Sequence, residues 1–395
     1  MDEKVKRTII IILDSVGIGE LPDADQYGDA GADTLGNMAR ELGGLDLPHL
    51  EKLGLGRIEE LEGVESDLAA PGVYGKMAEA SVGKDTTTGH WELAGLISRS
   101  PFPTYPDGFP DEVIEPFKEA TGRGILGNKP ASGTVIIEEL VEEHFETGYP
   151  IVYTSADSVF QIAAHEEVIE VEELYEMCEK AREILSGEHG VARVIARPFV
   201  GKPGELERTD RRKDFSLAPP GTTLLNRFEE AGERVIGVGK IVDIFAGDGV
   251  TEYDHTIDNM KCVDITLNYM EEEESGLIFT NLVEYDMVYG HRRNVEGYYQ
   301  ALVDFDERLP EILASLREDD LLILAADHGC DPTYEGTDHT REYVPLLMVG
   351  EMLKEDYHLK TRDSFADMAA TIAELHGLEG TEDGESFAGE IVKEK

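Results

Sequence analysis

The sequence predicts an α/β fold whose core is a doubly wound, mostly parallel sheet, with a smaller α/β domain inserted into it. Three observations carry this prediction. Apolar runs without alternation recur along the chain, and polar stretches that suit helices separate them. Between about residues 101 and 220 the composition changes, with clusters of Pro and Gly. Strands buried on both faces produce such runs, and their alternation with helices is typical of a parallel sheet.

Core strands are expected in four places. Thr8 to Leu13 is a continuous, mostly β-branched run, and the same signature returns at residues 235–238, 277–283 and 321–326. Each of the last three follows a polar, helix-compatible stretch and precedes Gly, Asp or His. Ligands of doubly wound sheets collect beyond the carboxyl ends of the strands, so residues that carry chemistry are expected there.

The inserted domain is expected over residues 101–220, which leaves 1–100 and 221–395 for a metal-binding catalytic core domain. A chain of 395 residues is too long for one compact core. Pro and Gly cluster near the start of the insertion, and helices are expected at residues 132–143 and 171–185. The second helix carries an apolar stripe that we interpret as core contacts: Leu174, Met177, Cys178, Ala181 and Leu185.

The composition excludes several classes of partner. A net charge of −48 repels both nucleic acid and anionic membranes, and we interpret it as a solvated acidic surface. An anionic substrate would therefore need a local cluster of Arg and Lys. Three widely spaced cysteines argue against a disulfide framework, and the apolar run at residues 9–13 is far shorter than the ~20 residues of a membrane span. We expect a cytoplasmic protein with no nucleic-acid or membrane partner.

Two candidate site residues lie in the first quarter of the chain. Asp14 directly follows the first strand in IIIILDSVGIG, and Thr86 is the first hydroxyl of the triplet in GKDTTTGHWELAG. A threonine beside a metal can lose its proton and attack phosphorus. Taken alone, each has a simpler reading, since Asp14 could form a turn and the threonines could cap the helix that Trp91 suggests.

The other candidates follow later strands. NLVEYDMVYGHRR contains Asp286 and His291, LLILAADHGCDP contains Asp327 and His328, and GTDHTREYVPLL contains His339. Any one of these histidines could be an ordinary structural residue. Capping alone does not explain why several strand exits all present carboxylate, imidazole or hydroxyl groups. Such mixed oxygen and nitrogen ligands suit manganese or zinc better than magnesium.

These segments, in this order, resemble the phosphopentomutases, a family of the alkaline phosphatase superfamily related to the cofactor-independent phosphoglycerate mutases. The resemblance runs nearly end to end. It is carried by DSVGIGELPDA, GADTLG, GKDTTTGHWELAG, GNKPASGT, YTSADSVFQIAAHEE, RVIARPFVG, VEYDMVYGHRR, ADHGCDPTYEGTDHTREYVPLL and DSFADMAATIAE. The DHG and GTDHTREYVP strings are superfamily signals, whereas the threonine segment and the strings of the insertion point to the pentomutases.

The resemblance implies an alkaline-phosphatase-like core with two manganese ions and an inserted cap. One ion would be held by Asp14, Thr86, Asp327 and His328, and the other by Asp286, His291 and His339. Thr86 matches the residue that the family phosphorylates. The family interconverts ribose 1-phosphate and ribose 5-phosphate, and the 2-deoxyribose phosphates likewise, and a sugar bisphosphate primes the enzyme.

The resemblance also implies substrate contacts. Arg193, Arg208 and Lys240 match the phosphate-binding region, and a guanidinium can grip phosphate with two hydrogen bonds. Ser155 and Asp157 resemble the residues that meet the sugar and its phosphate. Cys330 follows DHG where the family usually has Asn, so it could alter hydrogen bonding around the metals or the metal preference.

Two alternatives remain at this point. The chain could be a hydrolase of the same superfamily, in which water attacks the phosphoenzyme, although the strings of the insertion speak against it. It could also be a non-catalytic acidic protein that stores divalent cations. That reading fits acids in exposed runs, whereas the candidate ligands here follow apolar strands.

Overall fold

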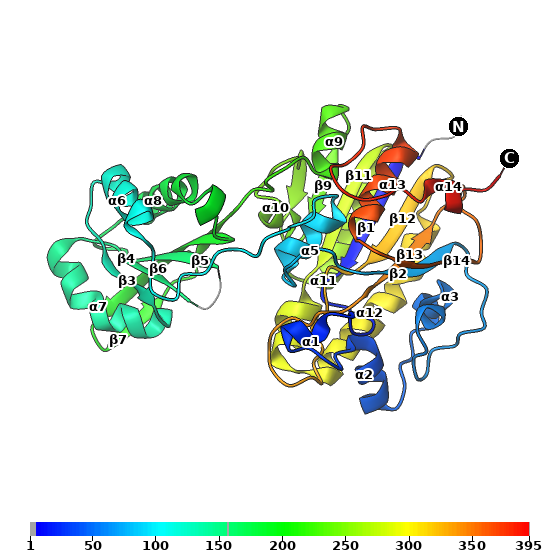
Figure 1. The fold of residues 1–395 in the computed structure, drawn as a ribbon, viewed down its shortest axis with the longest axis horizontal. Helices are drawn as coiled ribbons and strands as arrows, with labels where there is room; N and C mark the ends of the chain where they lie inside the picture. The colour runs from blue at the N-terminus through cyan, green and yellow to red at the C-terminus, as the bar shows by residue number, and fades with distance from the viewer. Residues whose placement is uncertain (1–4, 156–157, 395) are drawn as a thin grey trace. The chain divides into compact units, whose positions relative to one another are not determined.

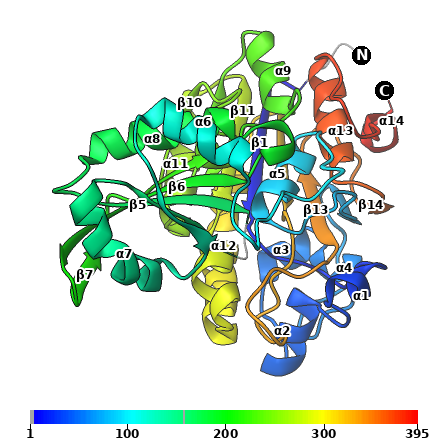
Figure 2. The same cartoon turned by 60° about the vertical axis from the view of Figure 1, so that its left-hand side comes forward.

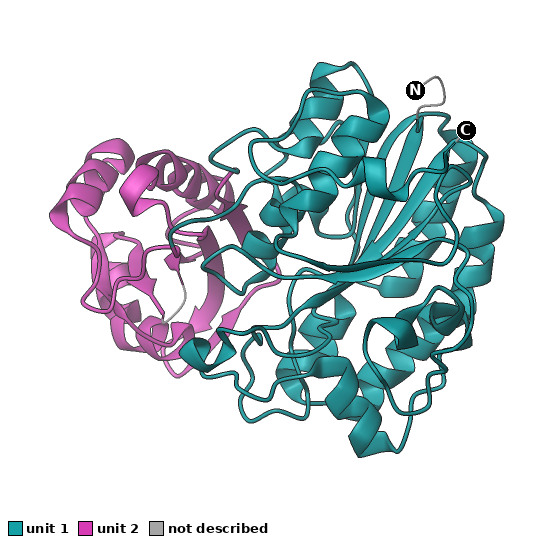
Figure 3. Cartoon of the chain, turned by 45° about the vertical axis from the view of Figure 1, so that its right-hand side comes forward, with its two compact units in different colours: residues 1–100, 219–395 teal, residues 101–218 magenta. Residues whose placement is uncertain are grey.

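The computed structural model describes residues 5–155 and 158–394. The chain forms two compact units, the first made of residues 1–100 and 219–395 and the second of residues 101–218. Figure 3 shows the first unit in teal and the second in magenta. The second unit is continuous in sequence, and the first consists of the two flanking segments.

The first unit is built on an eight-stranded sheet in the order β10-β9-β11-β1-β12-β13-β2-β14. All neighbouring strands pair in parallel except those that flank β13, which is antiparallel to both β12 and β2. The strands are β1 (Arg7–Leu13), β2 (Val73–Met77), β9 (Val235–Val238), β10 (Glu252–Asp254), β11 (Gly276–Leu282), β12 (Asp320–Ala325), β13 (Val344–Val349) and β14 (Tyr357–Arg362). Every residue of β1, β9, β11 and β12 is buried, as the unbroken apolar runs predict.

Helices cover both faces of this sheet, so the doubly wound α/β class is confirmed (Figure 1, Figure 2). One face carries α2 (Thr34–Leu42), α3 (Pro48–Lys52), α4 (Leu55–Ile58), α11 (Asn259–Glu272) and α12 (Val295–Ala314). The other carries α5 (Thr86–Leu93), α9 (Leu224–Glu230), α10 (Ile241–Ile244), α13 (Ala366–His376) and α14 (Ala388–Ile391). A short helix, α1 (Ala24–Tyr27), lies in the loop after β1, and two irregular turns, η2 (Tyr285–Tyr289) and η3 (Gly290–Arg292), follow β11.

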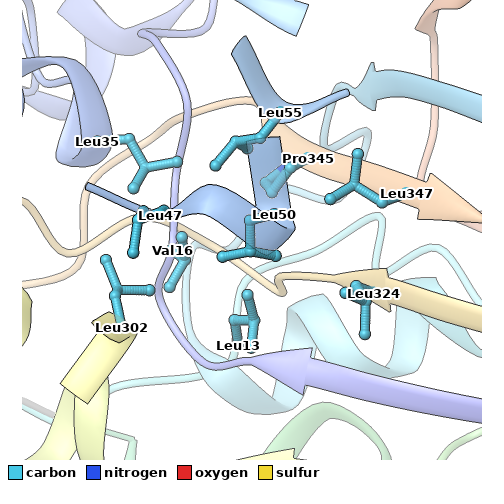
Figure 4. A pocket seen from close by; sticks show the side chains of 10 residues that line it. All are labelled: Leu13, Val16, Leu35, Leu47, Leu50, Leu55, Leu302, Leu324, Pro345 and Leu347. Carbon is cyan, nitrogen blue, oxygen red and sulfur yellow. The ribbon is translucent and has the colours of Figure 1, made fainter. Parts of the chain in front are cut away.

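The core beneath the first of these faces is closely packed. A small gap of about 10 Å³ remains there. It is lined by apolar side chains, drawn in Figure 4, from β1, α2, α3, α4, α12, β12, β13 and the loops beside them. Such a gap is barely large enough for one water molecule and offers it no polar partner. It belongs to the core and not to a ligand site.

The second unit is a sheet with helices on both faces. Its strands β3 (Leu126–Pro130), β4 (Ile151–Thr154), β5 (Val159–His165), β6 (Arg193–Lys202) and β7 (Glu205–Arg208) lie in that order, and β8 (Lys213–Ser216) also pairs with β6. Helices α6 (Asp111–Thr121) and α8 (Val171–Ile184) pack with one apolar cluster, and α7 (Gly133–Thr147) packs with the other. A single 3-10 turn, η1 (Gly187–His189), follows α8.

The expected elements of the insertion compare well with the observed ones. The two helices expected at 132–143 and 171–185 correspond to α7 and α8, and Ser132 is the N-cap residue of α7. All five residues of the apolar stripe, Leu174, Met177, Cys178, Ala181 and Leu185, are buried in one core cluster. Across the described residues, no helix combines the length and the apolar character needed to cross a bilayer.

Candidate metal centre

The carboxyl ends of three neighbouring strands bring the candidate ligands together. β1 lies between β11 and β12, and Leu13 pairs in register with Leu282 while Ile12 pairs with Ala325. The three strands therefore end at the same edge. Asp14 follows β1 directly, Asp327 follows β12, and Asp286 lies in η2 after β11. Parallel pairing of these strands explains how residues about 300 positions apart in sequence reach one site.

The first cluster comprises Asp14, Asp327 and His328, whose ligand atoms all lie within 4.8 Å of one another. His328 Nε2 is 3.5 Å from Asp14 Oδ1 and 3.3 Å from Asp327 Oδ2. Thr86 Oγ1 lies 3.2 Å from the same imidazole nitrogen. All four residues that the resemblance assigns to one ion thus face a common point.

The second cluster is centred on Asp286. Its two carboxylate oxygens lie 3.2 Å from His291 Nε2 and 3.3 Å from His339 Nε2. His291 Nδ1 donates to the carbonyl of Thr337 at 2.7 Å, which leaves Nε2 as the nitrogen available to a metal. Two groups of ligand atoms share Asp286, one with His328 and His339 and the other with His291 and Cys330.

The electrostatics of these clusters fit a divalent cation. Among the residues that the structure describes, one buried oxygen each of Asp14, Asp286 and Asp327 and the Nε2 of His339 form no well-aligned hydrogen bond, and their nearest polar neighbours are the other groups of the cluster. Such burial is costly unless a ligand satisfies these atoms. Burial, together with the charges of Asp327 and Asp286, raises the pKa of Asp14 well above its usual value. A cation at this point would remove that repulsion and satisfy the orphaned atoms.

Contacts between Asp286 and the imidazoles shift the pKa values of these groups. Burial alone would raise the pKa of Asp286, but His291 and His339 hold it well below the usual range. Reciprocally, the hydrogen bond with Asp286 raises the pKa of His291 to about 9. Metal binding would displace these imidazole protons, since only neutral imidazole ligates.

Thr86 is the first residue of α5, so its hydroxyl reaches the cluster from the start of a helix and not from the end of a strand. The alternative reading, in which a threonine of the triplet caps this helix, is wrong because Asp85 is the N-cap residue. Its carboxylate accepts from the backbone N–H and the hydroxyl of Thr88, at 3.1 and 2.6 Å. The hydroxyl of Thr86 is therefore free to face His328, at the end of a helix where the backbone dipole favours negative charge.

Two buried residues that sequence reasoning passed over link these ligands to one another. His90 Nδ1 lies 2.9 Å from the carbonyl oxygen of Thr86 and 3.0 Å from Asp327 Oδ2. Its Nε2 lies 3.3 Å from Asn281 Nδ2, which also donates to Asp14 Oδ2 at 2.8 Å. Contacts of this kind fix the orientation of metal ligands. The signal for His90 was present in GKDTTTGHWELAG, at helical spacing from Thr86.

Arg341 was also missed, although it lies in the GTDHTREYVP string. Its guanidinium donates to the carbonyl oxygens of Glu79, Ser81 and Gly83 at 3.0, 2.8 and 2.7 Å. It also contacts the carboxylates of Glu79 and Asp23, at 2.7 and 3.3 Å. The segment that leads to Thr86 is thus bound to the loop that carries His339.

Comparison with known proteins assigns the family. The model of the metalloenzyme superfamily matches residues 6–380. Phosphopentomutases from Carboxydothermus hydrogenoformans and Acetivibrio thermocellus are 62% and 60% identical to the chain, and each alignment covers 98% of this chain and 100% of the relative. The chain belongs to the phosphopentomutase family. Phosphopentomutases are isomerases, so the chain is an enzyme of that class, and the clusters above are its candidate metal sites.

The substrate contacts implied by the resemblance are distributed over both units. In the second unit, Ser155 and Arg193 line one pocket of about 380 Å³, and Arg208 is exposed on β7. Lys240 belongs to the first unit, where it precedes α10. Asp157 lies outside the described residues.

The pocket of the second unit gathers three arginines in a chain whose net charge is −48. Besides Arg193 it is lined by Arg197 and Arg212, which sequence reasoning did not select, and by Gln161. Arg197 Nε donates to Gln161 Oε1 at 2.7 Å, and Arg193 and Arg212 both lie near Asp214, at 3.5 and 2.6 Å. Burial, and after it the charges of neighbouring arginines, lowers the pKa of Arg197, which shows that the charged guanidinium is disfavoured in this place. A bound anion would offset that cost by pairing with the guanidinium.

Proposed function

We propose that the chain interconverts ribose 1-phosphate and ribose 5-phosphate, and the corresponding 2-deoxyribose phosphates, through a phosphothreonine at Thr86. The observation that carries the proposal is the position of the Thr86 hydroxyl, 3.2 Å from His328 Nε2, which itself lies 3.5 Å from Asp14 Oδ1 and 3.3 Å from Asp327 Oδ2. The identity of 62% to a relative named phosphopentomutase supports it.

In the proposed reaction, the resting enzyme carries a phosphoryl group on Thr86. The free hydroxyl of a sugar monophosphate attacks phosphorus in line, so that a new O–P bond forms as the bond to Thr86 Oγ1 breaks. The resulting sugar bisphosphate then returns its other phosphoryl group to Thr86. A free sugar bisphosphate would load the threonine initially and so prime the enzyme.

Residues of the chain hold this hydroxyl in place. Asp85 caps α5, His90 contacts the carbonyl of Thr86, and Arg341 binds the preceding segment. Such positioning accounts for much of the catalysis of phosphoryl transfer, which asks for little covalent chemistry from the protein.

Two divalent ions would complete the site, one held by Asp14, Thr86, Asp327 and His328 and the other by Asp286, His291 and His339. Bound there, they would neutralise charge on the transferred phosphoryl group. Manganese suits this mixture of carboxylate and imidazole ligands. We propose that the arginine pocket of the second unit binds the phosphate of the substrate. The resemblance adds Ser155, Asp157, Arg208 and Lys240 as candidate substrate-binding residues. The three cysteines are unpaired and buried, in keeping with action in the cytoplasm.

The test is phosphorus NMR of purified protein with manganese, a trace of sugar bisphosphate and ribose 1-phosphate. The proposal requires the ribose 5-phosphate signal to grow, and Thr86→Ala to abolish that growth while Thr87→Ala, which removes the adjacent hydroxyl, preserves it. Release of inorganic phosphate in place of ribose 5-phosphate would instead make the chain a phosphatase. Full turnover by Thr86→Ala would refute the assignment of the nucleophile.

A further inference from the structure

Cys330 lies beside two of the candidate metal ligands. Its Sγ, a carboxylate oxygen of Asp286 and a ring nitrogen of His291 all lie within 4.8 Å of one another. Cys330 is 1% exposed, so its thiol is shielded from bulk solvent. Three different kinds of ligand atom, from the loop after β12 and from the turns after β11, therefore share one small region.

The backbone fixes Cys330 in this place. Its N–H donates to the carbonyl of Ser15 at 3.1 Å, which ties it to the residue that follows Asp14. A Cβ on Gly290 would lie only 2.8 Å from Cys330 Sγ, so glycine allows the turn that carries His291 to pack against the thiol. The remaining contact of Sγ is a weak one with the carbonyl of Asp338 at 3.7 Å. The thiol thus has a defined position and no strong partner among the described residues.

The other two cysteines differ in their surroundings. Cys178 lies in α8 of the second unit and Cys262 in α11 of the first, and neither belongs to a group of ligand atoms among the residues that the structure describes. Cys262 provides a matched control, since it is also fully buried and its Sγ also lies 3.7 Å from a backbone carbonyl, that of Asn281.

We infer that Asp286, His291 and Cys330 form a mixed oxygen, nitrogen and sulfur ligand set that binds a thiophilic divalent cation, zinc or cadmium, through the thiolate of Cys330. Thiolate ligands favour such ions over manganese and magnesium, and zinc accepts Cys, His and carboxylate ligands together. Binding forms a sulfur–metal bond and releases the thiol proton to solvent. The inference rests on the proposed function in one respect, because Asp286 and His291 are the residues assigned there to a manganese ion.

Cadmium is the probe, because its bond to thiolate absorbs in the ultraviolet where manganese gives no comparable band. Cadmium titrated into the metal-free, full-length protein should produce a charge-transfer band and release protons. Cys330→Ser should abolish the band and weaken cadmium binding at least about tenfold, since even residues that merely orient a metal ligand contribute that much. Cys262→Ser should keep both. An equal band in Cys330→Ser, or no band in the wild-type protein, would overturn the inference.

A second measurement does not depend on any variant folding. Cadmium-113 NMR of the wild-type protein should give a resonance shifted downfield by a sulfur ligand, and a resonance typical of oxygen and nitrogen ligands alone would contradict the inference. Mutase turnover of the wild-type protein with manganese separates the two proposals. Turnover without a thiolate signal would refute only the thiophilic site, and a thiolate signal without turnover would support that site and refute the proposed function.

Discussion

Replacing Arg341 with Lys should separate the positioning of Thr86 from metal binding. Arg341 is 3% exposed, and its guanidinium makes six hydrogen bonds, three of them to the carbonyl oxygens of residues 79, 81 and 83. Lysine keeps the positive charge beside the buried carboxylate of Glu79 but offers three N–H donors where arginine offers five. With one acceptor for each N–H, lysine keeps at most three of the six contacts.

The expected magnitude follows from this count. At about 1 kcal/mol for each net hydrogen bond, the variant should lose about 3 kcal/mol of the free energy of unfolding. The released carbonyls belong to the segment that leads to Asp85 and Thr86, so Thr86, the proposed nucleophile, loses its fixed position. A displacement of about 1 Å in a reacting group can cost roughly a hundredfold in rate. We therefore expect kcat to fall about a hundredfold while the metal content stays unchanged.

The chain provides both a probe and a control for this experiment. Trp91 is the only tryptophan, it is buried, and it lies on α5 beside the segment in question, so its fluorescence reports urea unfolding of the first unit. Arg317 is the matched control, because it also donates to three backbone carbonyls, those of residues 270, 271 and 273, but next to the amino end of β12. Arg317→Lys should lose stability and keep kcat. If Arg341→Lys loses stability yet retains kcat within about twofold, Arg341 is only a structural anchor.

Four further predictions concern the metal centre, the arginine pocket and a buried acid. The glutamine of His90→Gln cannot contact Asp327 and the carbonyl of Thr86 in the way the imidazole does, so manganese affinity measured by calorimetry should fall about 10- to 100-fold. An unchanged affinity would show that His90 does not orient the candidate ligands. Arg197→Gln should raise KM for ribose 5-phosphate about tenfold with little change in kcat, whereas a fall in kcat alone would place Arg197 in the chemical step. Removal of metal by a chelator should lower the melting temperature of the first unit, because the buried carboxylates then repel one another. Manganese at 100 times its Kd should restore about 2.7 kcal/mol of the free energy of unfolding. An identical melting curve with and without metal would argue against a metal in this cluster. Burial raises the pKa of Glu342 to about 8, so its stabilising contribution is complete below the ordinary range of a glutamate and is lost as the pH rises through about 8. Relative to Glu342→Gln, the wild-type protein should therefore lose free energy of unfolding between about pH 5 and pH 8, and a difference independent of pH would show that the carboxyl is not protonated in the folded state.

Much of the fold could be read from the sequence because buried parallel strands leave a strong local signal. The expected strand at 235–238 coincides with β9, and those at 8–13, 277–283 and 321–326 differ from β1, β11 and β12 by one residue at one end or at both. Strands buried on both faces can hold only apolar side chains, so their position is written into a few consecutive residues. The residue types that follow them, carboxylate and imidazole, likewise indicated metal ligands without knowledge of any contact.

The tertiary structure decided which of these residues meet and what holds them. Only the order β11-β1-β12 places Asp14 between Asp286 and Asp327, and no local pattern specifies the neighbours of a strand. Other contacts also depended on the tertiary structure. Asp85 was chosen over adjacent polar side chains as the cap of α5, and the contacts of His90 and Arg341 and the arginine pocket of the second unit depend on how the elements pack. Apolar periodicity determines where an element forms because it is a property of consecutive residues. The contacts of a polar side chain depend on how the elements pack, because hydrogen bonds and charges act over a few ångströms in space whatever the separation along the chain.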